Sequence, residues 1–267
     1  MRIKSNLLPL SKNFLQDVKS FCLEQIKSGH LIVCGGVSDI LREDYVNESL
    51  PDDRASKHYN VSDENWRSQL WISCSPVASE ILNGCDPEDL SVIYVWRAGL
   101  GFLKSFSSFG VKNNFHIGLS RNEKKPEKTA AIYLPLSPKM IKSKIKKYVI
   151  ADIMLATGGS FETIIKPLLD SKKVEENKII LSCLIASPEG IYNLLKQYPA
   201  ITIYVGAVDD HLDKNAYLVP GLGDAGDLFF QRLSSNYFKA LGQFFNEDQW
   251  VMLEHKIALA NPIIRVY

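Results

Sequence analysis

Short apolar runs alternate with segments of helical spacing through the middle of the chain. The runs suit strands that are covered on both faces, and they comprise residues 90–96, 115–120, 149–151, 178–186 and 201–207. Between them, apolar residues recur every three or four positions, as in Phe161, Ile164, Ile165 and Leu168. Strands that alternate with helices favour a parallel sheet with right-handed crossovers. We therefore predict an α/β fold with a Rossmann-like parallel sheet.

The first third of the chain carries weaker patterns. Residues 10–27 have helical spacing, and residues 31–37 could form a short strand. The pair Gly35-Gly36 in that segment suits a turn better than a phosphate loop. Residues 42–63 are polar and predict a long loop, whereas residues 64–82 predict a helix with a proline inside it.

Size and composition fit one large α/β domain. The chain has 267 residues, of which 46% are apolar, and a formal net charge of +1. This charge gives no reason to expect a nucleic-acid or membrane partner. The N-terminal segment lacks the apolar run of a signal peptide, and no stretch reaches membrane-spanning length. Five cysteines without metal-binding spacing predict free thiols in a reducing cytoplasm and no zinc site.

The segment from Asp152 to Ser160 combines a strand end, a glycine turn and a helix start. Free N–H groups of the first helical turn and the helix dipole favour an anion at such a place. The two glycines, Gly158 and Gly159, let the backbone close around phosphate oxygens. Asp152 could accept a hydrogen bond from a sugar hydroxyl or hold a metal ion. The alternative is an ordinary N-capped helix after a tight turn.

Arg97 follows the strand 90–96 and is itself followed by Gly99 and Gly101. An arginine at a strand end can bind a pyrophosphate through bidentate hydrogen bonds. A surface arginine before a glycine-loosened helix start explains the same residues equally well. Ligands of parallel sheets bind at the carboxyl ends of the strands, so Arg97 and Asp152 are expected at the same rim of the sheet.

A glycine-rich segment, residues 217–227, closes the patterned region with Tyr-Leu-Val-Pro-Gly-Leu-Gly-Asp-Ala-Gly-Asp. Its glycines and proline predict a loop of fixed backbone angles and no helix or strand. Bare N–H and C=O groups in such a loop could match the donors and acceptors of a pyrimidine dione. A rigid surface loop with two solvated aspartates is the alternative. His211, just before this loop, is expected to be solvated and not catalytic.

These three loops resemble those of the uracil phosphoribosyltransferases. The family's usual forms are Asp-Pro-Met-Leu-Ala-Thr-Gly-Gly-Ser, Leu-Arg-Ala-Gly-Leu-Gly-Met and Tyr-Ile-Val-Pro-Gly-Leu-Gly-Asp-Ala-Gly-Asp. The resemblance runs from about Leu90 to Asp227, with every loop in the family's order, and it includes the segment 187–191. It implies the type I phosphoribosyltransferase fold, with a small hood formed by the late loop and the first third of the chain.

The resemblance also implies roles for individual residues. Asp152, Arg97 and Asp224 are the expected catalytic residues, and Arg97 and Arg121 would contact the diphosphate of the donor. The expected donor-binding residues are Arg97, Arg121, Asp152, Met154, Leu155, Ala156, Thr157, Gly158, Gly159, Ser160 and Asp224. The expected uracil-binding residues are Leu218, Gly223, Asp224 and Ala225. The segment 124–136 would form a mobile hairpin that covers the reaction.

The implied reaction joins uracil to phosphoribosyl diphosphate and yields UMP and pyrophosphate, a step of pyrimidine salvage. Mg²⁺ would enter bound to the donor, and a homodimer or homotetramer is expected. The sequence departs from the family at four places: Ile153 replaces proline, Ser120 replaces tyrosine, Pro135 replaces lysine, and Leu228 replaces arginine or lysine. These departures motivate two alternatives: a catalytically lapsed protein that binds or senses a nucleotide, and a transferase for another base.

Residues 233–267 extend beyond the usual end of the family's chains. Apolar spacing over residues 233–245 and 250–259 predicts helices that pack on the core or on a partner subunit. We therefore expect a phosphoribosyltransferase domain over residues 1–232, with a divergent first third over residues 1–89. Residues 233–267 would form a C-terminal helical extension.

Overall fold

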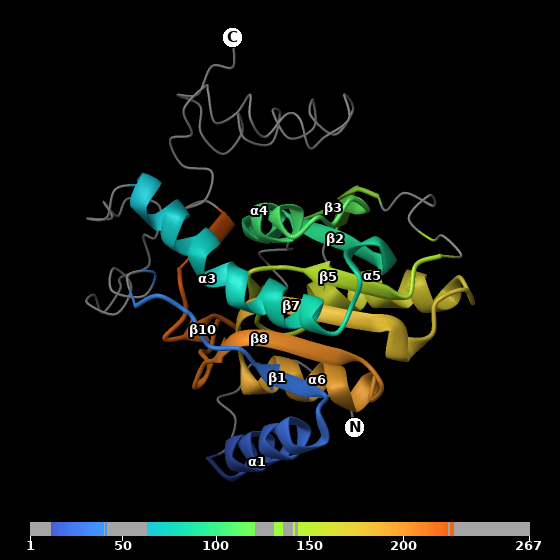
Figure 1. The fold of residues 1–267 in the computed structure, drawn as a ribbon. Helices are drawn as coiled ribbons and strands as arrows, with labels where there is room; N and C mark the ends of the chain where they lie inside the picture. The colour runs from blue at the N-terminus through green and yellow to red at the C-terminus, as the bar shows by residue number, and fades with distance from the viewer. Residues whose placement is uncertain are drawn as a thin grey trace.

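A mainly parallel sheet organises the protein in the computed structural model, which describes residues 12–39, 41, 63–120, 131–135, 141, 144–223 and 225–226. The strand order is β1-β8-β7-β5-β2-β3-β4, with the short strand β6 paired to β7 (Figure 1). The strands are β1 Leu31–Val33, β2 Leu90–Trp96, β3 Asn114–Ser120, β4 Ala131–Leu134, β5 Lys147–Ala151, β6 Met154–Leu155, β7 Ile179–Ala186 and β8 Thr202–Val208. The predicted α/β fold with its parallel sheet is confirmed.

The strand order reverses between β2 and β5, which are hydrogen-bonded neighbours. From β2 the chain proceeds outward to β3, whereas from β5 it proceeds in the opposite direction to β7 and then β8. Among the described strands of this sheet, β4 alone is antiparallel, and it pairs with β3 at the edge. Open α/β sheets bind ligands beyond the carboxyl ends of the strands where the order reverses. The rim above β2 and β5 is therefore the place to look for a site.

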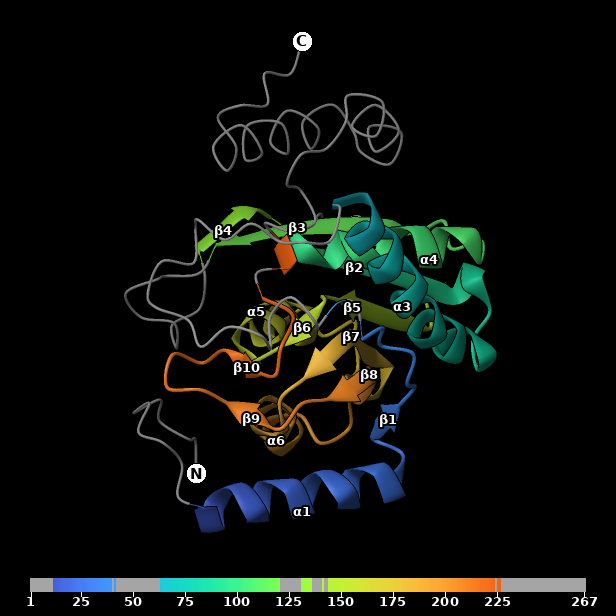
Figure 2. The ribbon, with the colours of Figure 1, turned by 90° about the vertical axis from the view of Figure 1, so that its left-hand side faces the viewer.

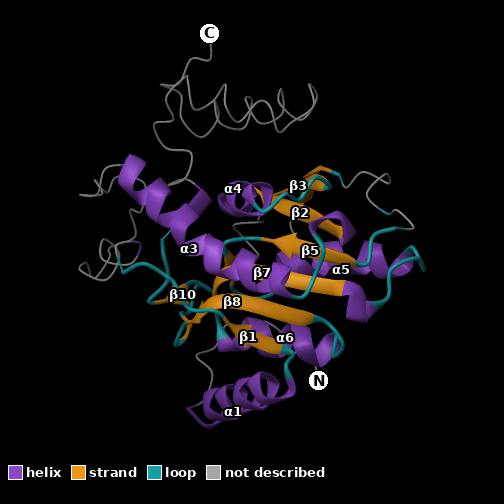
Figure 3. Ribbon diagram, viewed as in Figure 1, coloured by secondary structure: helices purple, strands orange, loops and turns teal. Residues whose placement is uncertain are grey.

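Helices cover both faces of this sheet (Figure 3). Helices α3 and α4 lie on one face, while α5 and α6 lie on the other, and α1 packs against α6. The α-helices are α1 Lys12–Ser28, α3 Asp63–Asn83, α4 Leu103–Ser108, α5 Gly159–Asp170 and α6 Pro188–Gln197. The 3₁₀ helices are η1 Pro87–Asp89, η2 Ala98–Phe102 and η4 Glu176–Lys178.

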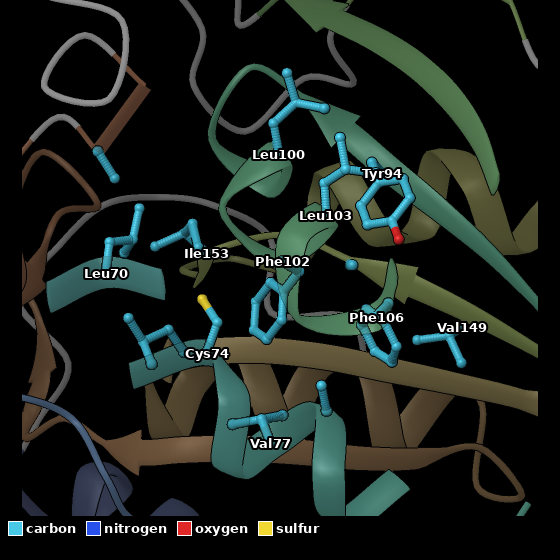
Figure 4. Close-up of a cluster of buried hydrophobic side chains, with 14 of the residues drawn as sticks. Leu70, Cys74, Val77, Tyr94, Leu100, Phe102, Leu103, Phe106, Val149 and Ile153 are labelled. Carbon is cyan, nitrogen blue, oxygen red and sulfur yellow. The ribbon is translucent and has the colours of Figure 1, made fainter. Parts of the chain in front are cut away.

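Strand β2 shows why every residue of its sequence except Ser91 is apolar. Alternate side chains such as Tyr94 join the core cluster beneath α3 and α4, whereas Ile93 joins the cluster beneath α5 and α6. Figure 4 shows Phe102 and Phe106 packed in the first cluster with Cys74 of α3. All seven residues of β2 are buried, as the continuous apolar run predicts.

Most elements fall where the sequence pattern places them, including the helix over residues 64–82 and the short strand after residue 30. The described part of the first third supplies α1, the edge strand β1 and α3. Of the expected loop over residues 42–63, residues 42–62 lie outside the described residues and Asp63 begins α3. The extension over residues 233–267 also lies outside the described residues. Within the described residues, no helix has both the length and the apolar character needed to cross a membrane.

The glycine-rich segment differs from its prediction at the beginning. Leu218–Val219 forms strand β10, which pairs antiparallel with β9, His211–Leu212. The Asp213 carboxylate accepts hydrogen bonds from the backbone N–H groups of Asn215 and Tyr217, and these bonds stabilise the turn between the strands. We call the hairpin and the loop after it, residues 211–223, the hood. Figure 2 shows the hairpin beyond the carboxyl ends of β7 and β8.

Candidate functional site

The loop between β5 and α5 ends in a helix start that no side chain caps. Gly158 is the N-cap residue of α5, with φ +91°, and it makes no side-chain capping hydrogen bond. The Thr157 hydroxyl accepts a long hydrogen bond, 3.5 Å, from the Gly159 N–H. An ordinary capped helix would occupy these N–H groups with a serine, threonine or aspartate side chain. The bare N-terminus of α5 instead suits an anion.

The N-terminus of α6 holds this loop in place. Ser187 Oγ donates to the carbonyl of Ala156 over 2.7 Å, and the Ser187 N–H donates to the carbonyl of Leu155. Asn193 Nδ2 donates to the carbonyl of Thr157 over 3.3 Å. A Cβ on Gly190 would overlap the Ala156 carbonyl oxygen, so α6 approaches the loop as closely as a glycine permits.

Sequence reasoning predicted α6 from the proline at position 188, but it missed the contacts of α6 with the β5–α5 loop. The available signal was Ser187, because a serine before such a proline is a typical N-cap. Its hydroxyl accepts from the Gly190 N–H while donating to the loop. The spacing of residues along the chain did not indicate the bond from Ser187 to the carbonyl of Ala156.

Asp152 stands directly after β5 and is half-buried. Its Oδ1 atom accepts a hydrogen bond of 2.8 Å from the N–H of Ile153. The carbonyl of Ile153 accepts from the N–H groups of Leu184 and Ile185 in β7. A proline, the family's usual residue at position 153, has no N–H and could not make the first bond. Isoleucine therefore adds a restraint on the carboxylate that the family loop lacks.

The loop after β2 packs tightly on the end of β5. A Cβ on Gly99 would overlap the carbonyl oxygen of Ala151 and lie 3.3 Å from the Asp152 Cα. A Cβ on Gly101 would lie 2.8 Å from Cδ1 of Ile153. Both glycines are thus required for the close approach of the two loops. Arg97 begins this loop, is half-buried, and follows a cis peptide bond from Trp96.

The same glycine contacts bring Arg97 and Asp152 to one rim of the sheet, where the strand order reverses. The indole Nε1 of Trp96, the residue before Arg97, donates to Nδ1 of the buried His116 over 3.0 Å. This bond fixes the last side chain of β2 against β3. Arg97 is therefore not the exposed surface arginine of the alternative interpretation.

The remaining predicted residues fall into three groups. Leu155, Ala156, Leu218 and Ala225 are buried, whereas Met154, Thr157, Gly159, Ser160 and Gly223 are partly exposed. Gly158, although buried, sets the helix start. Arg121, Asp224 and Leu228 lie outside the described residues, as do residues 124–130 of the expected hairpin. Leu218, Leu222 and Ala225 share one apolar cluster with Ile153 and Ala156, so the hood lies beside the β5–α5 loop.

His211 lies at the hood but away from any reactive arrangement among the described residues. Its Nδ1 atom is 2.9 Å from Oδ2 of Asp210, and Asp210 also forms an ion pair with Lys19 of α1. Hydrogen bonds from Lys19 and His211 lower the pKa of the Asp210 carboxyl. Within the described residues, no three His, Cys, Asp or Glu side chains come together as a metal-binding group.

The N-terminus of α5, an aspartate and an arginine loop lie at the switch point of a parallel sheet, an arrangement that suits an enzyme of the phosphoribosyltransferase class. The chain belongs to the uracil phosphoribosyltransferase family, whose model matches residues 74–231. A Mycoplasma mobile protein named uracil phosphoribosyltransferase is 40% identical over 144 residues, which make up 54% of this chain and 66% of that protein. The match thus spans just under two thirds of the Mycoplasma protein.

Two further proteins are similar to this chain, one in sequence and one in fold. A Streptococcus pyogenes protein (serotype M5, strain Manfredo), also named uracil phosphoribosyltransferase, is 36% identical over 157 residues, which cover 72% of its length. The solved structure of the AQ2163 protein from Aquifex aeolicus superposes with a TM-score of 0.57 at 22% identity. That superposition covers 84% of this chain and 98% of the Aquifex chain, and it supports the fold alone.

Proposed function

We propose that this chain is a uracil phosphoribosyltransferase, which joins uracil to phosphoribosyl diphosphate and releases UMP and pyrophosphate. The observation that carries the proposal is the N-terminus of α5, which has no side-chain cap from its N-cap residue and follows Asp152 in one loop at the reversal of strand order. The anion site and the carboxylate are separated by only a few residues of one loop. This spacing suits a ligand that carries both a phosphate and a sugar hydroxyl.

The donor would lie along the β5–α5 loop. Its 5′-phosphate would accept hydrogen bonds from the N–H groups of residues 157–160, where the helix dipole favours negative charge. Asp152 would accept from a ribose hydroxyl, since one carboxylate oxygen is already oriented by Ile153. Arg97 would bind the diphosphate, and Arg121 would add a second guanidinium from the segment after β3.

The base would bind under the hood, against residues 218–225. Leu218, Gly223, Asp224 and Ala225 are the proposed contacts, by likeness to the family's loop. Backbone N–H and C=O groups can match the alternating acceptors and donors of uracil, as a partner base would. The loop must hold a fixed backbone for this, and Pro220 and Gly221 suit that need.

Catalysis would depend on stabilising charge as the bond to the diphosphate breaks. Negative charge builds on the leaving diphosphate while the anomeric carbon becomes cation-like, so prearranged positive groups lower the barrier. Arg97 and Arg121 would supply such groups on the protein side. Mg²⁺ bound to the donor would supply further positive charge. The base would attack through N1, and its proton would pass to water or to Asp224.

A turnover assay with labelled uracil, donor and Mg²⁺ tests the proposal directly. We expect formation of labelled UMP, and we expect Asp152→Asn to lower kcat by about tenfold or more because the ribose contact loses its charged acceptor. The matched control is Asp170→Asn, the same change at an exposed position at the end of α5. Equal rates for Asp152→Asn and the wild-type protein would contradict the assignment of Asp152.

Two alternatives are separated by the same assay. A protein that only binds or senses nucleotide would bind UMP or donor in calorimetry while forming no product. A transferase for another base would be inactive with uracil but active with one member of a base panel. A homodimer or homotetramer is proposed from the family resemblance, and sedimentation equilibrium would measure it.

A further inference from the structure

Hydrogen bonds of one buried residue, Asp209, connect the middle of the hood to the rim of the sheet. Asp209, the residue after β8, is 5% exposed, and its Oδ2 atom accepts a 2.9 Å hydrogen bond from the N–H of Gly221. The N–H of Asp209 in turn donates to the carbonyl of Ala186 at the end of β7 over 2.8 Å. The sheet therefore fixes the carboxylate, and the carboxylate fixes the loop.

Gly221 is the place where this bond has the most effect on the loop. It has φ +70°, and a Cβ at this position would lie 2.5 Å from the carbonyl oxygen of Leu218. It also lies between Leu218 and Gly223, two of the proposed base contacts. A hydrogen bond to an ionised carboxylate in a buried place is stronger than one between neutral groups. Its loss would release the segment that presents backbone groups to the base.

A second buried carboxylate holds a different part of the hood. Glu189 is 5% exposed, and its Oε1 atom accepts from the N–H of Leu212 in β9 over 3.0 Å. Glu189 lies in the first turn of α6, where the helix dipole favours its negative charge. The hairpin and the base-facing loop thus have separate attachments. The bond from Asp209 is the one that reaches the residues proposed to contact the base.

We propose that Asp209 is a positioning residue for the base: it sets the backbone of residues 218–223 and thereby the affinity for uracil. The inference rests on the proposed function of the hood loop. The β5–α5 loop has its own attachments, the bonds from Ser187 and Asn193, whereas Asp209 holds the hood loop at Gly221. Its effect should therefore fall on the base and leave the donor unchanged.

The test compares Asp209→Leu with Asp209→Asn. Leucine is close to aspartate in size and cannot accept the Gly221 N–H, so we expect KM for uracil to rise by about tenfold or more. Asparagine keeps an acceptor oxygen, so its KM for uracil should stay within about threefold of the wild-type value. KM for phosphoribosyl diphosphate should stay within about twofold in both variants. An unchanged uracil KM in Asp209→Leu, or an equal rise in both KM values, would overturn the proposal.

Asp213→Leu is the matched control within the hood. The Asp213 carboxylate also accepts backbone N–H bonds, but it serves the hairpin turn between β9 and β10. Its uracil KM should change by less than about twofold. If Asp213→Leu raises the uracil KM as much as Asp209→Leu does, general loosening of the hood explains the effect and the positioning role is wrong.

Hydrogen exchange of a peptide covering residues 218–223 separates this inference from the proposed function. We expect faster exchange of the Gly221 amide in Asp209→Leu than in Asp209→Asn, whatever base the protein uses. A wild-type protein that forms no UMP contradicts the proposed function, yet the exchange result still decides whether Asp209 positions the loop. Identical exchange in the wild-type protein and both variants would refute the positioning role.

Discussion

At the scale of single residues, Gly158 meets two requirements that other residues cannot meet together. Its φ of +91° lies in the left-handed region, and a Cβ would come within 2.9 Å of Cγ of Leu194 in α6. Because the N-cap has no side chain to accept hydrogen bonds, the first turn of α5 keeps its N–H groups for a ligand. The left-handed backbone at Gly158 and the proposed binding of phosphate by α5 thus both depend on the lack of a side chain at this residue.

Replacing Gly158 with alanine tests this conclusion. We expect Gly158→Ala to lower the free energy of unfolding by about 1–3 kcal/mol, from left-handed strain and the clash with Leu194. We also expect KM for phosphoribosyl diphosphate to rise several-fold, because the phosphate-facing turn must shift. Urea denaturation and steady-state kinetics measure the two effects.

The control for this prediction is Gly110→Ala. Gly110 has φ +88°, but a Cβ there would have no atom within 4 Å, so it carries the backbone strain without the clash. It lies after α4 and has no proposed contact with substrate. A rise in donor KM for Gly110→Ala equal to that of Gly158→Ala would show that the effect is not local to the phosphate turn.

At the scale of secondary-structure elements, α6 both begins a helix and supports a loop. Ser187 is its N-cap, accepts from the Gly190 N–H, and donates to the carbonyl of Ala156. All the partners of this hydroxyl are buried. The first turn of α6 is therefore part of the structure that holds the phosphate-facing turn of α5.

Ser187→Ala should weaken both functions of α6 at once. Loss of the cap and of the bond to Ala156 should lower the free energy of unfolding by about 1–3 kcal/mol. Donor KM should rise while uracil KM stays within about twofold, because Asp209, outside α6, holds the base-facing loop of the hood at Gly221. Ser171→Ala is the control, since Ser171 Oγ donates to the carbonyl of Leu168 and accepts from the N–H of Lys173, both near the C-terminal end of α5. Equal changes in the two variants would contradict the supporting role of α6.

The sequence predicts the elements better than it predicts the contacts between them. Both ends of strand β2 could be predicted from the sequence, because burial on both faces produces a run of residues that is apolar except for Ser91. The start of α6 was predictable because proline suits the first helical position. The short strands β9 and β10 were not, since two-residue strands carry no periodicity and their pairing depends on the fold.

The same limit applies to the site. The glycines of the β5–α5 loop and of residues 97–101 could be predicted as site residues from the sequence. Glycine alone allows the left-handed backbone or the close approach that these loops need. The bonds from Ser187 to Ala156 and from Asp209 to Gly221 join segments that meet only through the strand order of the sheet. The spacing of residues along the chain does not indicate which segments the sheet brings into contact. Ser187 and Asp209 could therefore not be identified as supporting residues before the fold was known.

At the scale of the whole molecule, burial changes the chemistry of all five cysteines. The described residues contain each of them as a free thiol, and burial is the largest cause of a raised pKa in each. The pKa rises to about 12 for Cys22 and to about 11 for Cys34, and it rises well above the usual value for Cys74 and Cys183. The folded protein therefore keeps its thiols protonated at alkaline pH values at which the thiols of the unfolded chain would ionise.

This difference predicts a loss of stability at alkaline pH. Above pH 9 the unfolded chain binds fewer protons at its thiols than the folded protein does, so the free energy of unfolding falls as pH rises. The contribution is fully present below the ordinary thiol pKa and is lost as the pH rises toward the folded value. A fully buried thiol such as Cys74 contributes a slope of at most about 1.4 kcal/mol per pH unit.

Comparing Cys74→Ala with the wild-type protein isolates this slope from that of other titrating groups. We expect the variant to be less stable at pH 7, because it leaves a small cavity, and to lose less stability between pH 9 and pH 10.5. Cys85→Ala is the control, since Cys85 is only partly buried and should change the slope less. Urea denaturation at half-unit pH steps measures both. Parallel curves for Cys74→Ala and the wild-type protein would mean that the Cys74 thiol ionises in the folded core.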